Sequence, residues 1–449
     1  MTKKPPLTQK RIFWFWLPLA AMWLMMAFEQ PAIAAVVARL PDPARNLAAV
    51  GVTFSLALIV ESPIIMLLTA GTALARGKRS YERLLNFTHI LSATLMALHV
   101  VIALTPLFGF IVGNLIGAPA EIIEPSRKAF LLMTPWTPAI AYRRLWQGVL
   151  IRFDRTRVVP LTIAARVVAG GVVLAAGLLT RRFSGATLGG IALSTGVIAA
   201  ALASYGFARS TVREHLSEPS PEDEPLPWGK LLEFYVPLAL TSFITLVGRP
   251  VLTFGLARAP QPLASLAVWP VIMGFIFLAR SFAFSYQEVV VALLKDGQSF
   301  EKLLRFTTGL ALSLSGGFAL VAVTPAGRLW FERVSGLTPD LVALALVPTM
   351  ILAFLPGLDT LLSWQRGLMV QVGHTRAITQ AVVLDVVVLV AVMLGVGALL
   401  PLAGATMAAI ALTSAVGAEW LYLWWRSRPE AAQVQAVPAG RTAIDLPFE

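Results

Sequence analysis

Twelve apolar segments, each long enough to cross a lipid bilayer, constrain this sequence more than any other feature. A membrane-spanning helix needs about 20 predominantly apolar residues. Only 13% of the residues are charged, whereas a typical soluble protein has about 25%. The sequence therefore predicts an all-α polytopic membrane protein. The predicted helices lie near 12–37, 47–72, 84–106, 128–150, 158–180, 186–207, 231–256, 264–292, 304–325, 341–363, 377–400 and 403–425.

The chain carries an internal duplication with one constant offset, which places Phe15 on Phe234 and Gly185 on Gly404. FWLPLA at 15–20 falls on FYVPLA at 234–239, and GATLGGIAL at 185–193 falls on GATMAAIAL at 404–412. Matches at prolines, charges and loop residues in one register indicate a true repeat. Each repeat holds six predicted helices, an even number, so both copies have the same topology. We therefore expect parallel repeats related by a pseudo-two-fold axis along the membrane normal.

The duplication divides the chain into two lobes. We predict an N-terminal six-helix lobe over 1–207 and a C-terminal six-helix lobe over 230–428. The intervening segment 208–229 is acidic and rich in proline, which is typical of a flexible cytoplasmic linker. The segment 429–449 is predicted to be a disordered cytoplasmic tail.

Basic residues are distributed unevenly between alternate loops. One set of loops holds 20 Lys and Arg residues and the other set holds nine. The positive-inside rule therefore predicts an integral protein of the plasma (inner) membrane with both termini in the cytoplasm. The net charge of +12 lies in these short loops. It fits contact with anionic membrane lipids, and we expect no nucleic-acid partner.

The sequence contains no motif for catalysis or for binding a metal. It has no cysteine, and its four histidines form no HExxH spacing. It also has neither a Walker A motif nor a GxSxG elbow. We therefore expect no enzyme activity, no metal and no cofactor, and the only ion expected to bind is a coupling H⁺ or Na⁺.

A few polar and charged residues lie within the apolar segments. Each charge there costs about 2.5–3.5 kcal/mol and usually faces a bundle interior or a watery cavity. Under the offset, Gln30 falls on Arg249 and Glu61 falls on Arg280. The residues predicted to bind substrate or to gate are Glu29, Gln30, Glu61, Arg249 and Arg280. Further candidates are Arg166, Asp385, and Arg143 and Arg144, of which the last two also fit snorkelling to the inner interface.

Positions related by an axis along the membrane normal lie at the same depth. Glu61 and Arg280 are then expected to meet across a cleft between the lobes, near mid-membrane. Glu29 and Arg249 are expected to meet nearer the outer side. Ion pairs that form and break as the cleft closes and opens would act as gates. The same charges also fit static ion pairs that hold helices together.

The duplicated six-helix lobes, each with a GAT motif in its last helix, resemble the multidrug/oligosaccharidyl-lipid/polysaccharide (MOP) flippase superfamily, which includes the MATE efflux pumps. Within that superfamily the sequence resembles the progressive ankylosis (ANK) family. The matching residues are Glu29-Gln30, Arg249-Pro250, SRKAFL at 126–131, Trp269-Pro270-Val271, Val347-Pro348 and GATM at 404–407.

The resemblance implies a MATE-like fold and secondary active transport by alternating access between two lobes, in a protein that works as a monomer. The animal family is associated with export of ATP, citrate, related carboxylates and pyrophosphate, which implies a small organic anion as substrate. Arginines suit such a substrate because a guanidinium group binds carboxylate and phosphate through two atoms. The resemblance supports Glu29, Gln30 and Arg249, while Glu61 and Arg280 rest on the repeat alone.

Two other functions fit the same residues. A MATE-like pump would exchange a cationic drug for H⁺ or Na⁺, with Glu29 or Glu61 as the ion site. A flippase would move a lipid-linked head group through a groove open to the bilayer.

Overall fold

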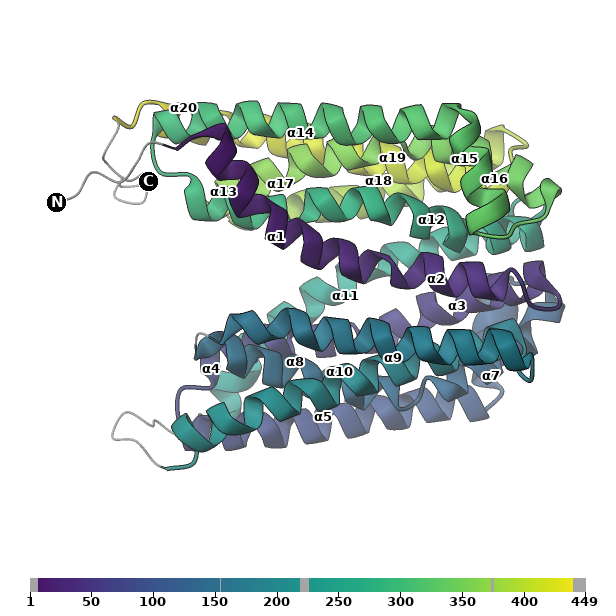
Figure 1. Cartoon of the computed structure of the whole chain (residues 1–449), viewed down its shortest axis with the longest axis horizontal. Helices are drawn as coiled ribbons and strands as arrows, with labels where there is room; N and C mark the ends of the chain where they lie inside the picture. The colour runs from purple at the N-terminus through teal and green to yellow at the C-terminus, as the bar shows by residue number, and fades with distance from the viewer. Residues whose placement is uncertain (1–6, 154, 219–225, 373–374, 439–449) are drawn as a thin grey trace. The chain divides into compact units, whose positions relative to one another are not determined.

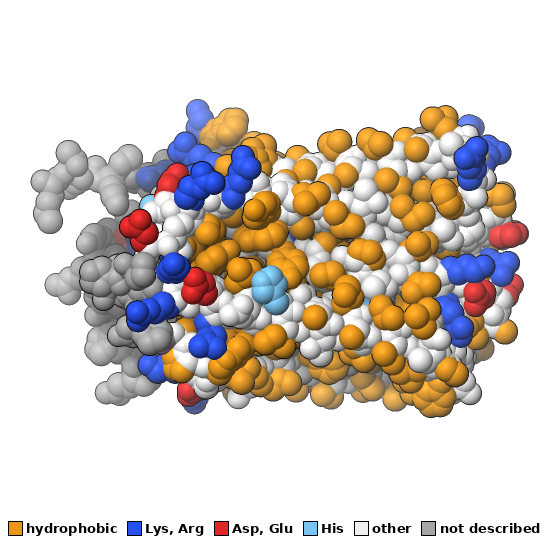
Figure 2. All heavy atoms as spheres, turned by 90° about the horizontal axis from the view of Figure 1, so that it is seen from below, with side chains coloured by type: hydrophobic (Ala, Val, Ile, Leu, Met, Phe, Trp, Pro, Cys, Tyr) orange, Lys and Arg blue, Asp and Glu red, His pale blue; other side chains and the backbone are white. Residues whose placement is uncertain are grey.

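A computed structural model describes residues 7–153, 155–218, 226–372 and 375–438, and every regular element in these ranges is helical (Figure 1). Figure 2 shows one face of the molecule, on which hydrophobic side chains form a band between two ends where charged side chains gather. Such a band is the expected surface of a protein that spans a bilayer, because lipid tails offer no partners for charge. The predicted all-α fold is confirmed.

Twelve helical segments match the twelve predicted ones. Ten of them, among the described residues, are long and apolar enough to cross a membrane. The other two are the segments predicted near 128–150 and 231–256, which are also helical. The first of these is divided by a turn at residues 133–135 into helices of 13 and 17 residues, each shorter than a full membrane span.

The chain forms two compact units, and each is described by itself. Unit 1 comprises Met1–Pro31 and Val271–Glu449, and unit 2 comprises Ala32–Pro270. Two helices pass from one unit into the other, namely α2 (Glu29–Val37) and α12 (Pro262–Phe284).

Unit 2 is built largely from the first repeat. Its elements are α3 (Pro43–Glu61), η1 (Ile64–Met66), α4 (Leu67–Leu74), α5 (Lys78–Leu104), α6 (Leu107–Gly109), η2 (Phe110–Ile116), α7 (Ala120–Leu132), α8 (Trp136–Arg152), η3 (Thr156–Val158), α9 (Val159–Thr180), α10 (Gly185–His215) and α11 (Trp228–Arg258).

Unit 1 is built largely from the second repeat. Its remaining elements are α1 (Gln9–Ala27), α13 (Tyr286–Leu293), α14 (Gly297–Val323), α15 (Pro325–Leu329), η4 (Trp330–Val334), α16 (Pro339–Leu352), α17 (Leu355–Gln371), α18 (Thr375–Leu399), α19 (Gly404–Arg426) and α20 (Arg428–Gln435).

The offset of the sequence repeat recurs in the helix boundaries. Helices α14 and α17 begin and end at the repeat counterparts of the residues that bound α5 and α8. Helices α11, α12 and α19 begin at the counterparts of the first residues of α1, α3 and α10. The two halves of the sequence therefore encode the same succession of helices, as the internal duplication predicts.

The compact units differ from the predicted lobes in one respect, because each takes its first helix from the opposite repeat. Helix α1 packs on α13 and α14, and the Trp16 indole donates to the Phe282 carbonyl at 3.1 Å. Helix α11 packs on α3, η1 and η2, and the Tyr235 hydroxyl donates to the Pro63 carbonyl. The lobe boundaries of the repeat remain a sequence prediction, while packing joins helices from both halves.

The described part of the C-terminal segment is a helix. Helix α20 packs against α14, α17 and α19, with Glu430 and Val434 buried. The Gly297 backbone N–H donates to the Val437 carbonyl at 3.1 Å. This corrects the prediction of a disordered tail up to residue 438, because burial of Val434 and the backbone bond offset the entropy of ordering the chain. Residues 439–449 of that prediction lie outside the described residues.

Helices α4 and α8 approach each other closely at a pair of glycines. A Cβ atom at Gly148 would lie 2.4 Å from the Leu68 carbonyl oxygen and 3.0 Å from the Gly71 Cα. The repeat counterpart of Gly148 is Gly367, where a Cβ would lie 2.7 Å from the Val290 Cβ. The close contact at Gly148 is with backbone atoms, so a larger residue there must push α4 and α8 apart.

We predict that Gly148→Leu destabilises the protein by about 1–3 kcal/mol, the usual cost of overpacking. The measurement is the midpoint of thermal unfolding in detergent. The matched control is Gly171→Leu on α9, where an added Cβ meets no atom within 4 Å. Equal midpoints for the two variants would contradict the close approach of α4 and α8.

Candidate functional site

Glu61 ends helix α3 inside unit 2, and it is 1% exposed. The helix stops there because of the two residues that follow. The Ser62 hydroxyl bonds back to the Ile59 carbonyl at 2.8 Å, and Pro63 has no N–H to continue the helical hydrogen bonds. The Pro63 carbonyl is held by Tyr235 of α11. This helix break fixes the Glu61 carboxylate in the protein interior.

Three arginines act electrostatically on Glu61. Arg166 of α9 makes the largest contribution, followed by Arg143 and then Arg144 of α8. Arg143 is 4% exposed. Three guanidinium groups therefore act on one carboxyl group, so positive groups outnumber the acidic group among these four residues. We call Glu61, Arg143, Arg144 and Arg166 the basic cluster.

The basic cluster retains unused hydrogen-bonding capacity. Glu61 Oε1 and Arg144 Nε are buried and have no hydrogen-bond partner among the described residues. On the next turn of α8, Gln147 donates to the Thr162 hydroxyl of α9 at 2.8 Å. That bond ties together the two helices that carry the arginines. A ligand with several anionic oxygens would supply negative charge and an acceptor for Arg144 Nε.

Unit 1 contains a second group of charged residues. Arg280 of α12 makes a two-atom ion pair with Asp359 of α17, with Nε–Oδ2 and Nη2–Oδ1 distances of 2.5 and 3.1 Å. The side chains of Arg280 and Asp359 are 13% and 5% exposed. Arg366 of α17 pairs with Glu419 of α19. Asp385 of α18 interacts electrostatically with all four. We call these five residues the acidic cluster.

The acidic cluster has one negative charge in excess, because three carboxylates face two guanidinium groups. Asp385 Oδ1 is buried and has no hydrogen-bond partner among the described residues. Glu419 is the group that acts on Asp385 most strongly, and it has the same sign of charge. Two carboxylates that act on each other electrostatically favour the binding of a proton or a cation.

Two residues of each cluster occupy equivalent positions of the repeat, with reversed charge. Under the offset, Glu61 falls on Arg280 and Arg166 falls on Asp385. Gln147 falls on Arg366. One duplicated scaffold thus carries an excess of positive charge in unit 2 and an excess of negative charge in unit 1.

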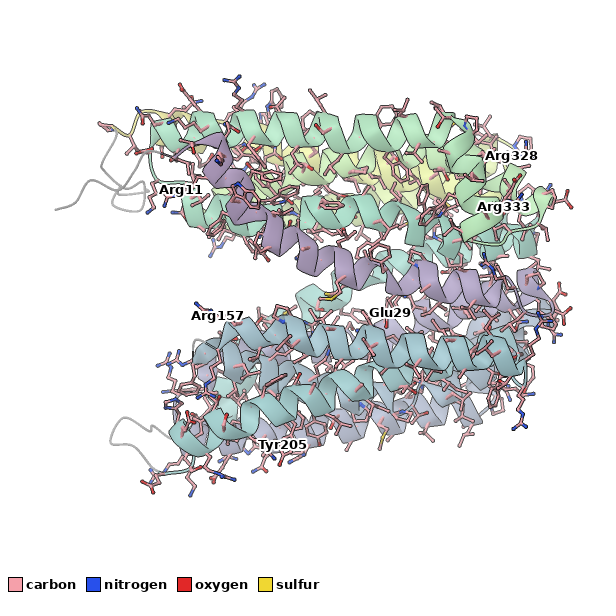
Figure 3. The ribbon with its side chains drawn as sticks, in the orientation of Figure 1. Arg11, Glu29, Arg157, Tyr205, Arg328 and Arg333 are labelled. Carbon is pink, nitrogen blue, oxygen red and sulfur yellow. The ribbon has the colours of Figure 1, made fainter. Side chains whose placement is uncertain are left out.

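Glu29 lies at the break between α1 and α2, where Phe28 separates the two helices. Figure 3 shows Glu29 along unit 1 between Arg11 at one end and Arg328 and Arg333 at the other. The predicted loop assignments put Arg11 and the other two arginines on opposite sides of the membrane. Glu29 therefore lies at an intermediate depth of unit 1.

The helix break at Glu29 is supported by close packing within unit 1. A Cβ atom at Gly274 of α12 would lie 3.2 Å from the Pro31 backbone nitrogen and 3.4 Å from the Gln30 carbonyl carbon. Glycine at 274 therefore lets the backbone of Gln30 and Pro31 rest directly on α12.

The predicted pairs across a cleft remain predictions. Arg249 lies in α11, but its side chain lies outside the described residues. Glu61 and Arg280 belong to different units, and the ion-pair partner of Arg280 is Asp359 of its own unit. The structure brings Arg143, Arg144 and Arg166 together around Glu61, and Asp385 together with Arg280.

Three members of the acidic cluster were absent from the predicted site residues, namely Asp359, Arg366 and Glu419. The signal for Asp359 was a charge inside the apolar segment near 341–363. Glu419 falls on Ala200 under the offset, so the repeat gives no signal for it. Only the packing of α19 on α17 identifies Glu419 as the partner of Arg366.

Solved structures with the same fold are membrane transporters. The chain is similar to a multidrug resistance MATE family transporter of the MOP superfamily in an inward-facing conformation, with a TM-score of 0.71 and 13% identity over 93% of this chain and 98% of that chain. It is similar to the lipid II flippase MurJ in an inward closed conformation, with a TM-score of 0.71 and 14% identity over 95% of this chain and 89% of that chain. It is also similar to a MOP superfamily transporter from Pyrococcus furiosus, which is described with a binding pocket of reverse polarity. The TM-score is 0.61, with 15% identity over 95% of this chain and 97% of that chain.

These likenesses define the class: the chain has the fold of the MOP superfamily of membrane transporters. A model of the progressive ankylosis protein (ANKH) family matches residues 1–266, which is more than half of the chain. The protein belongs to the progressive ankylosis protein family. A comparison with proteins of curated function gives no match.

We predict that Asp359→Ala destabilises the protein by about 3–5 kcal/mol, because it leaves the Arg280 charge buried without its partner. The matched control is Glu332→Ala, which removes the exposed ion pair with Arg328 and is expected to cost less than about 1 kcal/mol. Thermal unfolding in detergent compares the two variants. Similar unfolding midpoints for both would show that the Arg280–Asp359 pair is not a buried structural pair.

Proposed function

We propose that this protein is a secondary active transporter of small organic anions and that the basic cluster binds the anion. The substrate class comprises citrate and other compounds that carry several carboxylate or phosphate groups. Membership of the progressive ankylosis family and the MOP fold support transport rather than catalysis. The observation that carries the substrate class is the excess of positive charge around Glu61.

The physical argument concerns the cost of that charge. Three arginines around one acidic residue are costly in a membrane-spanning bundle, and a bound anion would lower that cost. A static structural role would be served at lower cost by a balanced pair such as Arg280 with Asp359. A cationic substrate would be repelled by the basic cluster. A multivalent anion would neutralise the excess charge and use the open donor at Arg144 Nε.

Alternating access of the two repeats, in a monomer with both termini in the cytoplasm, is the proposed mode of transport. Glu29, Gln30 and Arg249 are proposed to contact substrate or to gate its path. The duplicated helix succession supports this mechanism, because two similar bundles can rock about a site between them. The plasma (inner) membrane is the proposed location.

We expect Arg144→Gln to reduce uptake of labelled citrate into proteoliposomes by at least about tenfold, because a charge-assisted hydrogen bond contributes about 1.5–3 kcal/mol. The unfolding midpoint should stay the same or rise, since the substitution relieves repulsion within the basic cluster. The matched control is Arg182→Gln in an exposed loop, which should transport as the wild type does.

The same assay includes a cationic dye. Dye uptake without citrate uptake would overturn the anion proposal in favour of a cation antiporter. If the wild type moves neither compound, flipping of a lipid-linked head group becomes the leading function. A lower unfolding midpoint for Arg144→Gln, with citrate uptake intact, would identify the arginines as structural partners of Glu61.

A role in ion coupling is proposed for the acidic cluster. The buried and unpartnered Asp385 Oδ1, beside Glu419, is the observation that favours it. A bound H⁺ or Na⁺ would neutralise the one negative charge in excess. The same feature supports the second candidate function, in which a cationic compound is exchanged for that ion.

We predict that Asp385→Asn abolishes the stimulation of citrate uptake by a pH or Na⁺ gradient while leaving citrate–citrate exchange intact. The reason is that the amide keeps the shape of the side chain but removes the charge that would attract the ion. Asp340→Asn, at an exposed position of α16, is the control. If gradient stimulation survives in Asp385→Asn, the coupling ion binds elsewhere.

A further inference from the structure

Unit 1 has an apolar groove on its surface, bordered by α1, α12 and α14. The main hollow has a volume of about 650 Å³. Four of its ten lining residues are aromatic, namely Phe13 and Trp16 from α1, Phe282 from α12 and Phe306 from α14. The Trp16 indole is already bonded to the Phe282 carbonyl, so it is not available to donate to a ligand. The hollow therefore suits a hydrocarbon chain.

The groove continues along α14. A second hollow of about 310 Å³ shares Phe282, Ser313 and Leu314 with the first and reaches Val321. The first hollow follows α14 from Arg305 to Leu314, which is about 13 Å at 1.5 Å per residue. That length is close to one leaflet of a hydrocarbon core about 30 Å thick. The second hollow extends the groove deeper into the membrane.

Small residues on one face of α14 keep the groove open. Gly309, Ser313 and Gly317 are spaced by four residues, so they lie on the same face of the helix. A Cβ atom at Gly309 would meet no other atom within 4 Å. Only 22% of the apolar window of α14 is buried. In a membrane-spanning helix, an exposed apolar face of this kind borders lipid.

One end of the groove carries a cation. Arg305 lines the first hollow and is exposed, and it has no hydrogen-bond or ion-pair partner among the described residues. Lys302 lies one turn earlier on α14, and its carbonyl accepts a bond of 2.8 Å from the side chain of Gln9. Arginine at the edge of a membrane-spanning helix is suited to bind a lipid phosphate.

We propose that this groove is a binding site for an anionic phospholipid. One acyl chain lies against Phe13, Trp16 and Phe306, and the phosphate of the head group binds Arg305. The proposal depends on neither the transported substrate nor the basic cluster, since its contacts all lie on α1, α12 and α14 of unit 1. It assigns to this groove a ligand that has both an apolar chain and a negative head group.

Native mass spectrometry of the purified full-length protein tests the proposal. The protein in detergent is mixed with equal amounts of phosphatidylglycerol and phosphatidylcholine of the same acyl chains. We expect the phosphatidylglycerol adduct to dominate for the wild type. Gly309→Leu fills the groove and should weaken lipid binding by at least about tenfold, because several buried CH₂ groups lose their contacts. Gly316→Leu is the matched control, since Gly316 is exposed on the same helix, meets no atom within 4 Å and does not line the groove.

A second pair of variants tests the head group. Arg305→Gln should lose the preference for phosphatidylglycerol by about fivefold while still binding lipid, because one basic residue near the surface contributes about 1 kcal/mol. Arg182→Gln should keep the preference. Equal binding by Gly309→Leu and Gly316→Leu would overturn the site. Loss of binding in Gly309→Leu without any head-group preference in the wild type would overturn the anionic ligand, leaving a groove that takes any acyl chain.

Discussion

Compensation of buried charge inside membrane-spanning helices is the constraint on which this structure depends. Lipid and protein interior solvate an isolated charge poorly, so each one must find a partner within its own bundle. Arg280 with Asp359 and Arg366 with Glu419 meet this requirement and tie α12, α17 and α19 together. In unit 2 the arginines of α8 and α9 share one acidic partner, Glu61, which the helix break after α3 holds in the interior.

The two clusters differ in the sign of the charge that predominates among their residues. Unit 2 keeps an excess of positive charge around Glu61, and unit 1 keeps an excess of negative charge around Asp385. The two clusters occupy equivalent helices, and we propose that they bind two different kinds of ligand. An anion bound at the basic cluster and a cation or proton bound at the acidic cluster would each offset the predominant charge there. The proposed coupled transport depends on this difference in charge between the two clusters.

Packing joins the two repeats through their first helices. Helix α1 completes a unit made mostly of the second repeat, and α11 completes a unit made mostly of the first. Helix α1 ends just before Phe28, and the backbone of Pro31 packs directly against Gly274 of α12. These two features fix the course of α1 and α2 within unit 1. The same placement of α1 against α14 creates the groove of unit 1, because the aromatic side chains of α1 form one wall of it. An exchanged helix therefore contributes both to the core and to the lipid-facing surface.

The sequence by itself determined the all-helical fold, the succession of helices and the duplicated register, because apolar length and self-similarity are local properties of the chain. It also located the charged positions within the helices, including Glu61, Arg166, Arg280 and Asp385. Tertiary structure alone decided which charges meet: Arg280 pairs with Asp359, and Arg366 pairs with Glu419, whose position has no charged counterpart in the other repeat. The tertiary structure alone also decided that α1 and α11 each pack with the opposite repeat and that Arg428–Gln435 forms the packed helix α20. The reason is that partner choice depends on which helix faces pack together, and a hydropathy pattern specifies a spanning helix without specifying its neighbours.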